Sequence, residues 1–439
     1  MKTEEIMEIL LDYSPFGKKL VFGINRKKYT RKIKRSIWNK LIKILVWFRR
    51  SWKSYIFRYL IYYLITRKKI EKENILFINL EDDRLFWNRN VKNLRQIYET
   101  YLENMRPKWK IYIFFDEIQV IKWWESFIRT LYEQNNDIEI FLTGSNSDLL
   151  SSEISSSLSW RFLEFKIYPL DFKEYLYFHN LNINSKNKYL KNKIEIKSLF
   201  NKYLKYWWLP EILEINNEEQ IEMYLEWIFN KIVIDDIVKR FNIRNVELIE
   251  LINKYLITNI SWILSYKNIE NSIKHYSHNI SHTTLTDYIN YIKKWFIIYD
   301  IWKFDWKIKS IFDTYKKYYV LDLWIREVKK LNSTNDLSKK IENLVFMKLL
   351  QDDEKIYYWQ DDKQKEIDFI TKNKNKFDKY QVISYLNPKN INRELWNFRL
   401  SDKYIKWDNF LITIENSEIL DYKWTKINKI NIIEWLLGI

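Results

Sequence analysis

The 439-residue sequence predicts an α/β fold in which a parallel sheet is followed by a helical region and a small second α/β domain. Two observations support this prediction. Short apolar runs alternate with helical stretches as far as residue 172, and such alternation is typical of a parallel sheet covered on both faces. Beyond residue 173 the sequence is rich in helix-like segments, and short strands return only after residue 296.

The individual elements follow from local patterns. Residues 1–40 look helical and basic. Strands are expected at five apolar runs, and helices are expected where apolar residues recur on one face. These strands are residues 43–48, 74–83, 110–119, 138–147 and 162–172, with helices at 54–67 and 124–134. The predicted domains are a lead-in (1–40), a core (41–180), a helical lid (181–216), a helix-then-hairpin module of winged-helix type (217–330) and a small α/β domain (341–439).

Composition excludes several classes of protein. Hydrophobic residues make up 47% of the chain and charged residues 30%, which is a globular composition. No apolar run approaches the ~20 residues of a membrane span. Without cysteine there is no disulfide framework and no thiolate metal site. The N-terminus carries early acids and has no signal-peptide layout, so the cytoplasm is the expected location.

The net charge of +17 has two interpretations. It favours polyanionic partners, above all nucleic acid. It also fits strongly AT-rich coding, which enriches lysine without any functional reason. The sequence leaves both interpretations open, so DNA is a candidate partner and not a deduced one.

The tryptophan content is anomalous. The chain has no alanine, only 4 glycines, and 21 tryptophans. AT-rich coding explains the scarcity of alanine and glycine, but it should also make the usual tryptophan codon, UGG, rare. Glycine and tryptophan together make about 6% of the chain, near the ~7% that glycine alone normally reaches. We hypothesise that most tryptophans are glycines encoded by UGA, whereas Trp124 and Trp435 lie on apolar helix faces and are expected to be genuine.

The first chemical motif stands between a predicted strand and a predicted helix. Phosphate-binding loops at such a place have the pattern G-x-x-x-x-G-K-[ST]. Residues 47–54 of this chain are WFRRSWKS, so the spacing is kept but tryptophan occupies both glycine positions. Lys53 would reach the β and γ phosphates and Ser54 would hold Mg²⁺. The alternative is an unrelated basic loop. The predicted ATP-binding residues of this loop are Trp47, Phe48, Arg49, Arg50, Ser51, Trp52, Lys53, Ser54 and Tyr55.

The second motif is a pair of acids at the end of the third predicted strand, IYIFFDE. Asp116 is positioned to bind Mg²⁺, and Glu117 is positioned to orient or deprotonate an attacking water. Two surface acids at a strand end are the alternative. That alternative is weakened by the phosphate-loop match about 60 residues earlier.

Two further motifs follow the next strands. In FLTGSNS, Thr143, Ser145 and Asn146 are candidates for sensing the γ-phosphate, and helix capping by Ser or Asn is an equal alternative. Arg161 follows a polar loop and precedes the fifth strand. It is a candidate to approach a γ-phosphate, either in its own chain or from a neighbouring subunit, and a solvated surface arginine is the alternative.

Together these motifs resemble those of prokaryotic AAA-type P-loop ATPases that carry a C-terminal domain of unknown function. The resemblance runs through FRRSWKSY, FFDEIQVIKWWE, LTGSNSDLLSSEISSSLSWR, YPLDFKEYL and KYYVLDLWIRE, and it covers nearly the whole chain. It implies an AAA+ core that binds ATP, a winged-helix region and a restriction-endonuclease-like C-terminal part. The resemblance implies glycine, the residue usual in the family, at the positions of Trp47, Trp52, Trp123, Trp160, Trp207, Trp208, Trp262 and Trp324.

The C-terminal domain contains an acidic pattern. Metal-dependent nucleases of this fold place an acid on one strand and an acid or Gln, then a lysine two residues on, on the next. Here Glu366 and Asp368 share one strand, Gln381 lies on the next, and Glu342 on the preceding helix would complete the cluster. The lysine position is Ile383, so the domain is expected to be inactive. Alternatively, these acids are solvent-facing strand residues.

Three functions therefore compete. The leading one is an ATP-binding, Mg²⁺-dependent NTPase that couples hydrolysis to motion of its C-terminal domains. The second is a non-hydrolysing module that binds nucleic acid or protein with a decayed nucleotide site, and the third is a nuclease. Candidate partners are a nucleotide, DNA, a second copy of the chain or another protein, and a membrane is not expected.

Overall fold

The computed structural model describes residues 1–17, 25–46, 53–134, 137–145, 158, 161–206, 212, 215, 217–275, 280–304, 315–329, 337–352, 355–373, 376–402 and 407–439. The chain divides into two compact units, Met1–Tyr168 and Pro169–Ile439. The predicted core ended twelve residues later, at 180. In the described part of the chain, no helix is both long and apolar enough to cross a membrane.

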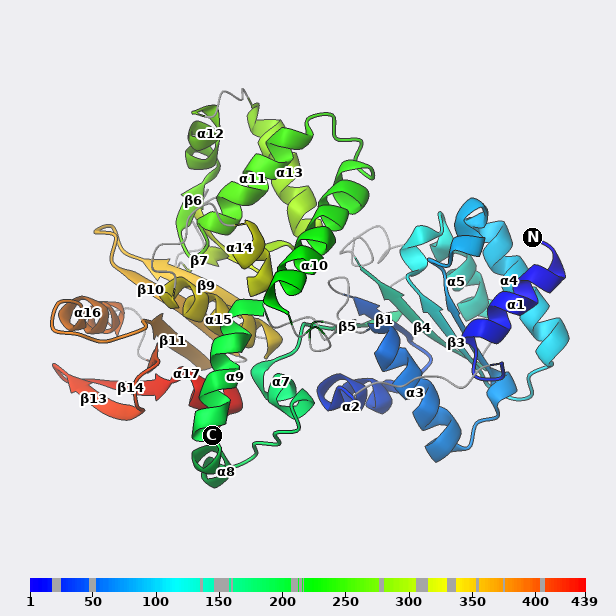
Figure 1. The fold of residues 1–439 in the computed structure, drawn as a ribbon, viewed down its shortest axis with the longest axis horizontal. Helices are drawn as coiled ribbons and strands as arrows, with labels where there is room; N and C mark the ends of the chain where they lie inside the picture. The colour runs from blue at the N-terminus through cyan, green and yellow to red at the C-terminus, as the bar shows by residue number, and fades with distance from the viewer. Residues whose placement is uncertain are drawn as a thin grey trace. The chain divides into compact units, whose positions relative to one another are not determined.

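The first unit is a sheet with helices on both faces (Figure 1). The elements agree with the predicted strands and helices to within a few residues, except that the fifth strand was expected to reach residue 172 and ends at Lys166. In chain order they are α1 (Thr3–Tyr13), α2 (Lys27–Ser36), β1 (Ile42–Val46), α3 (Lys53–Lys68), η1 (Lys72–Asn74), β2 (Ile75–Asn79), η2 (Asp83–Asn88), α4 (Val91–Met105), β3 (Ile111–Asp116), η3 (Ile118–Val120), α5 (Trp124–Gln134), β4 (Ile138–Gly144) and β5 (Phe162–Lys166).

The sheet of the first unit is entirely parallel, with the strand order β2-β3-β4-β1-β5. β4 therefore lies between β1 and β3. All carboxyl ends meet at one edge of the sheet, which is where ligands bind in open parallel sheets. The chain leaves β1 at this edge to enter residues 47–52, and β3 and β4 end at the same edge.

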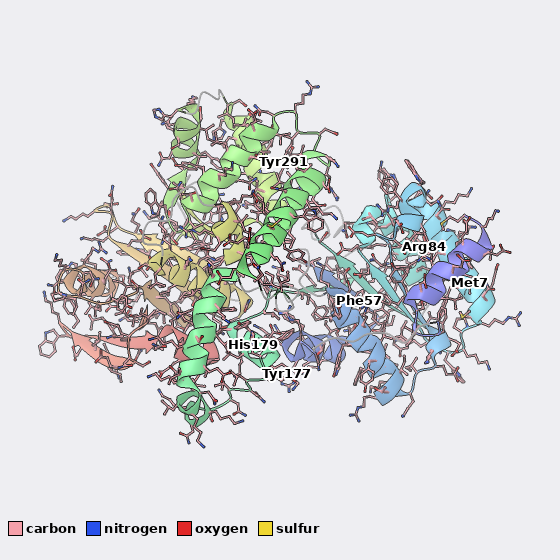
Figure 2. The ribbon with its side chains drawn as sticks, in the orientation of Figure 1. Met7, Phe57, Arg84, Tyr177, His179 and Tyr291 are labelled. Carbon is pink, nitrogen blue, oxygen red and sulfur yellow. The ribbon has the colours of Figure 1, made fainter. Side chains whose placement is uncertain are left out.

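The two faces of this sheet carry different layers. Alternate strand residues such as Ile113 and Phe115 pack in one core cluster with α1, α4 and α5. On the other face, Phe57 of α3 (Figure 2) makes edge-to-face contacts with Phe77, Phe114 and Phe141, with ring centroids 5.1 to 6.4 Å apart. Truncating a buried Phe costs ~3–5 kcal/mol, so this contact fixes α3 and the residues at its start firmly on the sheet.

The second unit begins with helices, most of its strands follow toward the C-terminus, and α17 is its last element. Its elements are α7 (Phe172–Phe178), α8 (Lys186–Lys191), α9 (Lys193–Tyr206), α10 (Glu218–Lys231), η6 (Ile232–Val238), α11 (Val246–Thr258), β6 (Ile263–Ser265), α12 (Tyr266–Lys274), α13 (His282–Lys294), β7 (Ile298–Lys303), β8 (Tyr315–Val320), α14 (Leu323–Lys329), α15 (Leu337–Gln351), β9 (Lys355–Gln360), β10 (Glu366–Asn373), β11 (Lys376–Val382), α16 (Ile391–Asp402), β12 (Asp408–Thr413), β13 (Glu418–Tyr422), β14 (Thr425–Asn431) and α17 (Ile432–Leu437).

One mixed sheet runs through the second unit, in the order β13-β14-β12-β11-β10-β9-β7-β8-β6. The helix-then-hairpin order expected for residues 217–330 is present. Its strands β7 and β8, however, do not form a separate hairpin, because β7 also pairs in parallel with β9. The predicted winged-helix and α/β domains thus share a sheet. The winged-helix assignment itself stays a prediction.

The tryptophans differ sharply in backbone conformation and exposure. Of the tryptophans that the structure describes, four have positive φ between 62° and 84° and are 51–96% exposed, namely Trp38, Trp109, Trp123 and Trp424. A non-glycine residue in the left-handed region costs ~1–2 kcal/mol, so these backbones favour glycine.

Other tryptophans are buried. Trp124, expected to be genuine, is 2% exposed. Trp324, expected from the resemblance to be a glycine, is fully enclosed in α14, so the structure does not favour glycine there. Trp262 is 55% exposed. The remaining positions expected to be glycine lie outside the described residues: Trp47, Trp52, Trp160, Trp207 and Trp208.

Candidate nucleotide site

The start of α3 brings the first two predicted site residues to the carboxyl edge of the sheet. Lys53 is 4% exposed, and its Nζ lies 4.0 Å from Oε1 of Glu117. Ser54, the next residue, makes a side-chain hydrogen bond with Asp116 at the end of β3. Tyr55 is half-buried, and the guanidinium of Arg58 lies 5.0 Å from its ring.

The loop that precedes α3 lies outside the described residues. The predicted nucleotide contacts of that loop therefore stay predictions. They are Trp47, Phe48, Arg49, Arg50, Ser51 and Trp52.

Asp116 is the centre of the described site. It is 2% exposed, and it accepts hydrogen bonds from the hydroxyls of Ser54 and Thr143. Burial raises the pKa of Asp116, and the neighbouring charge of Glu117 raises it further; the two hydrogen bonds and Lys53 act in the opposite direction. A buried carboxyl whose charged form is disfavoured gains from a nearby cation. Carboxylate and hydroxyl oxygens are also the ligands that Mg²⁺ prefers, so the donor set fits this ion.

Glu117 is held by its backbone as well as by its side chain. It has φ of 56°, in the left-handed region, and its N–H donates to Thr143 Oγ1 at 2.9 Å. Such strained residues cluster at functional sites. The side-chain amide of Gln119 donates to Glu117 Oε2 at 2.6 Å and to Ser145 Oγ at 3.1 Å. Sequence reasoning missed Gln119, although its place two residues after Glu117, in DEIQ, is the signal that could have found it.

Thr143 joins the two acids. Its hydroxyl donates to Asp116 and accepts from the Glu117 backbone, so this residue of β4 connects the ends of two neighbouring strands. Thr143 and Ser145 are both fully buried. Asn146 lies outside the described residues. Of the three candidate sensors, Thr143 is thus the one whose contacts with the acids are seen.

Arg161 lies away from this group. It immediately precedes β5, and its carbonyl accepts from the N–H of Ile42 at the amino end of β1. The amino and carboxyl ends of these strands are about 16 Å apart, at ~3.3 Å per residue over five residues. Arg161 instead pairs with Glu133 at 2.8 Å. Within one chain the structure does not bring Arg161 to Lys53, which leaves the neighbouring-subunit alternative as a prediction.

A second predicted group of residues comes together in the other unit. Glu342, Glu366, Asp368 and Gln381 line one cavity. Asp368 is 7% exposed, so it is not a solvent-facing strand residue. The expectation that this cluster lacks a basic group was wrong: Ile383 is buried and apolar as expected, but Lys317 of β8 supplies an ammonium between the acids. Lys317 lies 66 residues before Ile383 in the chain, so local spacing could not reveal it.

The fold and the first site together define a class of protein. The molecule has a parallel sheet, a buried lysine followed by a serine at the start of the helix after β1, and an Asp-Glu pair at the end of β3. These are the parts of a P-loop ATPase. A family model described as an AAA domain matches residues 39–176. The first unit is therefore an AAA-type P-loop ATPase domain. A second model, a domain of unknown function (DUF8612), matches residues 197–332.

Two relatives are similar to this chain over most of its length. The uncharacterized protein MJ1544 of Methanocaldococcus jannaschii is 31% identical over 434 residues, covering 97% of this chain and 90% of that protein. An uncharacterized protein of Haemophilus influenzae is 28% identical over 417 residues, covering 94% and 98%. The Walker-type ATPase PABY2304 of Pyrococcus abyssi, a solved structure, has a TM-score of 0.44 and 16% identity over 70% of this chain and 95% of that one. The chain therefore belongs to the same family as MJ1544.

Proposed function

We propose that this protein is an ATP-binding, Mg²⁺-dependent NTPase that couples hydrolysis to motion of its C-terminal unit. The observation that carries the proposal is the hydrogen-bonded chain Ser54–Asp116–Thr143–Glu117 beside the buried Lys53. Each member stands at the carboxyl edge of the sheet, where a nucleotide would lie. A surface cluster of unrelated polar residues would not be buried and mutually bonded in this way.

Each side chain has a defined task in this proposal. Lys53 places its ammonium against the β and γ phosphates. Ser54 and Asp116 provide oxygen ligands for Mg²⁺, which when bound neutralises charge on the phosphate oxygens. Glu117, turned by its left-handed backbone, orients or deprotonates a water molecule. Thr143 is hydrogen-bonded to both acids and so fixes their positions relative to each other. A movement of one acid would therefore shift the other.

The proposal requires glycine at positions 47 and 52. An indole there would occupy the space in which backbone N–H groups approach the phosphates. Support comes from Trp38, Trp109, Trp123 and Trp424, whose positive φ is the conformation in which glycine is favoured. We infer that UGA-encoded glycines account for these positions and for Trp47 and Trp52. UGG codons at 47 and 52 would contradict this.

The proposed role of Glu117 separates binding from hydrolysis. In a chain carrying Trp47→Gly and Trp52→Gly, the variant Glu117→Gln should retain ATP binding and lose turnover by ~10²–10⁴-fold, the usual contribution of a general base. Glu103→Gln, an exposed acid of α4, is the matched control and should keep full turnover. Turnover in Glu117→Gln equal to that of the parent chain would remove Glu117 from this role.

Two partners follow from the same proposal. The position of Arg161 on the amino edge of the sheet suits a contact with the nucleotide of a second copy of the chain.

The net charge of +17 suits DNA as the other partner, and binding to DNA should weaken steeply as the salt concentration rises. Absence of DNA binding at low salt would argue against a nucleic-acid role.

A further inference from the structure

The excess positive charge of the chain lies in one segment. Residues 13–70 contain 18 of the 74 lysines and arginines and none of the 57 acids, so this segment carries +18. The remaining residues contain 56 basic and 57 acidic side chains and together carry −1. AT-rich coding enriches lysine along the whole chain, but it does not remove acids from one place. With 57 acids spread evenly over 439 residues, about seven would fall in a stretch of 58. The segment therefore needs a physical explanation.

Two helices of this segment pack beside each other in the structure. α2 lies next to α3 in the first unit (Figure 1). The ammonium of Lys34 of α2 lies 4.7 Å from the ring centroid of Tyr59 and 4.2 Å from that of Tyr63, both of α3. A cation over an aromatic ring gains ~0.5–1 kcal/mol at an exposed site. These contacts hold the basic residues of both helices in one surface.

The exposed cations of the two helices form a surface that we call the basic face. Its members are Lys27, Arg31 and Arg35 of α2 and Arg67 and Lys68 of α3. The three on α2 recur every four residues, so they lie along one side of that helix. Within the described part of the chain, Arg31, Arg35 and Arg67 form no salt bridge. Their charges are therefore available to a partner.

Lys34 shows that the two halves of the basic face lie close together. Burial lowers the pKa of Lys34, Tyr63 raises it, and the charges of Arg31 and Arg67 lower it further. A lysine whose pKa is lowered by both arginines lies near both of them. Like charges that are close together disfavour each other's charged form. A polyanion bound over the basic face would remove this cost.

The opposite side of the first unit has the opposite charge. α1 packs on the other core cluster with α4 and α5, and it carries Glu4, Glu5, Glu8 and Asp12 and no cation. A codon bias would act on both sides alike. Because the unit has a cationic side and an anionic side, its field steers an approaching polyanion toward α2 and α3.

The density of charge on α2 suits a duplex better than a single strand. The ten residues of α2 span ~15 Å at ~1.5 Å each, and they include six cations and no acid. Over ~15 Å a DNA duplex presents ~9 phosphate charges, whereas one strand presents only ~4. Sites for single strands also use aromatic rings on which bases stack. Here Lys34 lies over the rings of Tyr59 and Tyr63.

The apolar residues of α2 argue against a membrane as the partner. Tyr29, Ile33 and Ile37, the residue after α2, are buried within the protein. A helix that binds at a membrane surface needs an exposed apolar face to insert into the lipid. α2 exposes cations and has no such face, so a nucleic-acid backbone fits it better than a lipid surface does.

We propose that the basic face binds the phosphate backbone of double-stranded DNA without reading its sequence. Arginine and lysine contacts with phosphates supply affinity and carry no sequence information. This inference rests on the DNA partner of the proposed function and assigns a surface to it. It needs no nucleotide, because the residues of the basic face are separate from Lys53 and the acids of the nucleotide site.

Fluorescence anisotropy of a short labelled DNA duplex of mixed sequence tests the proposal on the nucleotide-free full-length chain. The parent carries Trp47→Gly and Trp52→Gly, and the variant adds Arg31→Gln, Arg35→Gln and Arg67→Gln. Each lost phosphate contact lowers the slope of log affinity against log salt by ~0.9, so the triple variant should lose ~2.7 of that slope. It should also bind at least ~10-fold more weakly at ~50 mM salt.

A second triple variant, Lys92→Gln, Arg95→Gln and Arg129→Gln, is the matched control. These exposed cations lie on α4 and α5, so the control has the same net charge with an intact basic face. It should bind the duplex as the parent does. Both triple variants should bind ATP as the parent does, so a failure of the basic face and a failure of the nucleotide site are distinguishable.

Three results would overturn the proposal: no duplex binding by the parent at low salt, an unchanged slope in the Arg31 triple variant, or equal weakening in the control. Tighter binding of single-stranded DNA than of the duplex would also overturn it. So would binding to phosphatidylserine vesicles that is lost in the triple variant while its DNA binding persists. If the triple variant does not fold, as judged by circular dichroism, Arg31→Gln alone should lose ~0.9 of the slope.

Discussion

The turn between β13 and β14 gives a direct test of whether a tryptophan position is built for glycine. Tyr422 pairs with Thr425, and the two residues between them, Lys423 and Trp424, have φ of 50° and 71°. Two-residue hairpin turns with positive φ at both central positions strongly prefer Asn-Gly or Asp-Gly. Trp424 is 96% exposed, so its ring contributes little packing. We therefore expect Trp424→Gly to stabilise the protein.

The expected gain follows from three contributions. The left-handed backbone costs a non-glycine residue ~1–2 kcal/mol, and the greater freedom of glycine in the unfolded chain offsets ~0.4–1 kcal/mol of that. Losing the buried 4% of a side chain of ~250 Å² costs ~0.25 kcal/mol. The net stabilisation is about 0.5 kcal/mol.

Urea unfolding of the full chain measures this gain against two controls. Trp424→Ala removes the same ring but keeps Cβ in the left-handed region, so it should show no gain. Trp124→Gly, at a buried position of α5, should lose at least ~3 kcal/mol. If Trp424→Ala is as stable as Trp424→Gly, positive φ is not the cause of the gain in stability, and the glycine interpretation of this turn fails.

Two further predictions concern the first unit. Thr143→Val should lower stability by ~1–3 kcal/mol in urea unfolding, because it removes the acceptor of the Glu117 N–H and one of the two hydroxyls that donate to Asp116; unchanged stability would show that these bonds contribute nothing. Asp82 has its pKa lowered to about 2 by Arg84 (Figure 2) and, secondarily, by the hydroxyl of Tyr13. Because the folded pKa is depressed, its stabilisation is present above about pH 4 and is lost as pH falls toward 2. Because Arg84 is partly exposed, we expect this interaction to contribute ~1–2 kcal/mol to the free energy of unfolding. Asp82→Asn should therefore lower the free energy of unfolding by that amount at pH 7 and by little at pH 2. An equal loss at both pH values would contradict this.

The parallel sheet was predictable because its signals are local. Four of its strands are mostly buried apolar runs, as in β1 and β4, and helices such as α5 show an apolar face. Asp116 and Glu117 were found because the polar residue after such a run must stand at the carboxyl edge. Their link through Thr143 could be expected only once β4 was known to lie beside β3.

The second unit was less predictable because its key contacts are non-local. The pairing of β7 with β9 joins two segments that were expected to be separate domains. Lys317 reaches Asp368 from 51 residues away, and no spacing rule within β10 and β11 points to it. The sequence carries no turn signal for the hairpin of β13 and β14, because tryptophan stands at 424, where a glycine would have indicated the turn.

We expect the chain to bind ATP once glycine stands at positions 47 and 52 of its loop. Isothermal titration of ATP with Mg²⁺ should compare the chain carrying Trp47→Gly and Trp52→Gly with the chain that keeps both tryptophans. We expect saturable ATP binding by the glycine chain, loss of that binding when Lys53→Ala is added, and no binding by the chain that keeps both tryptophans. No ATP binding by the folded glycine chain, or binding that survives Lys53→Ala unchanged, would contradict it.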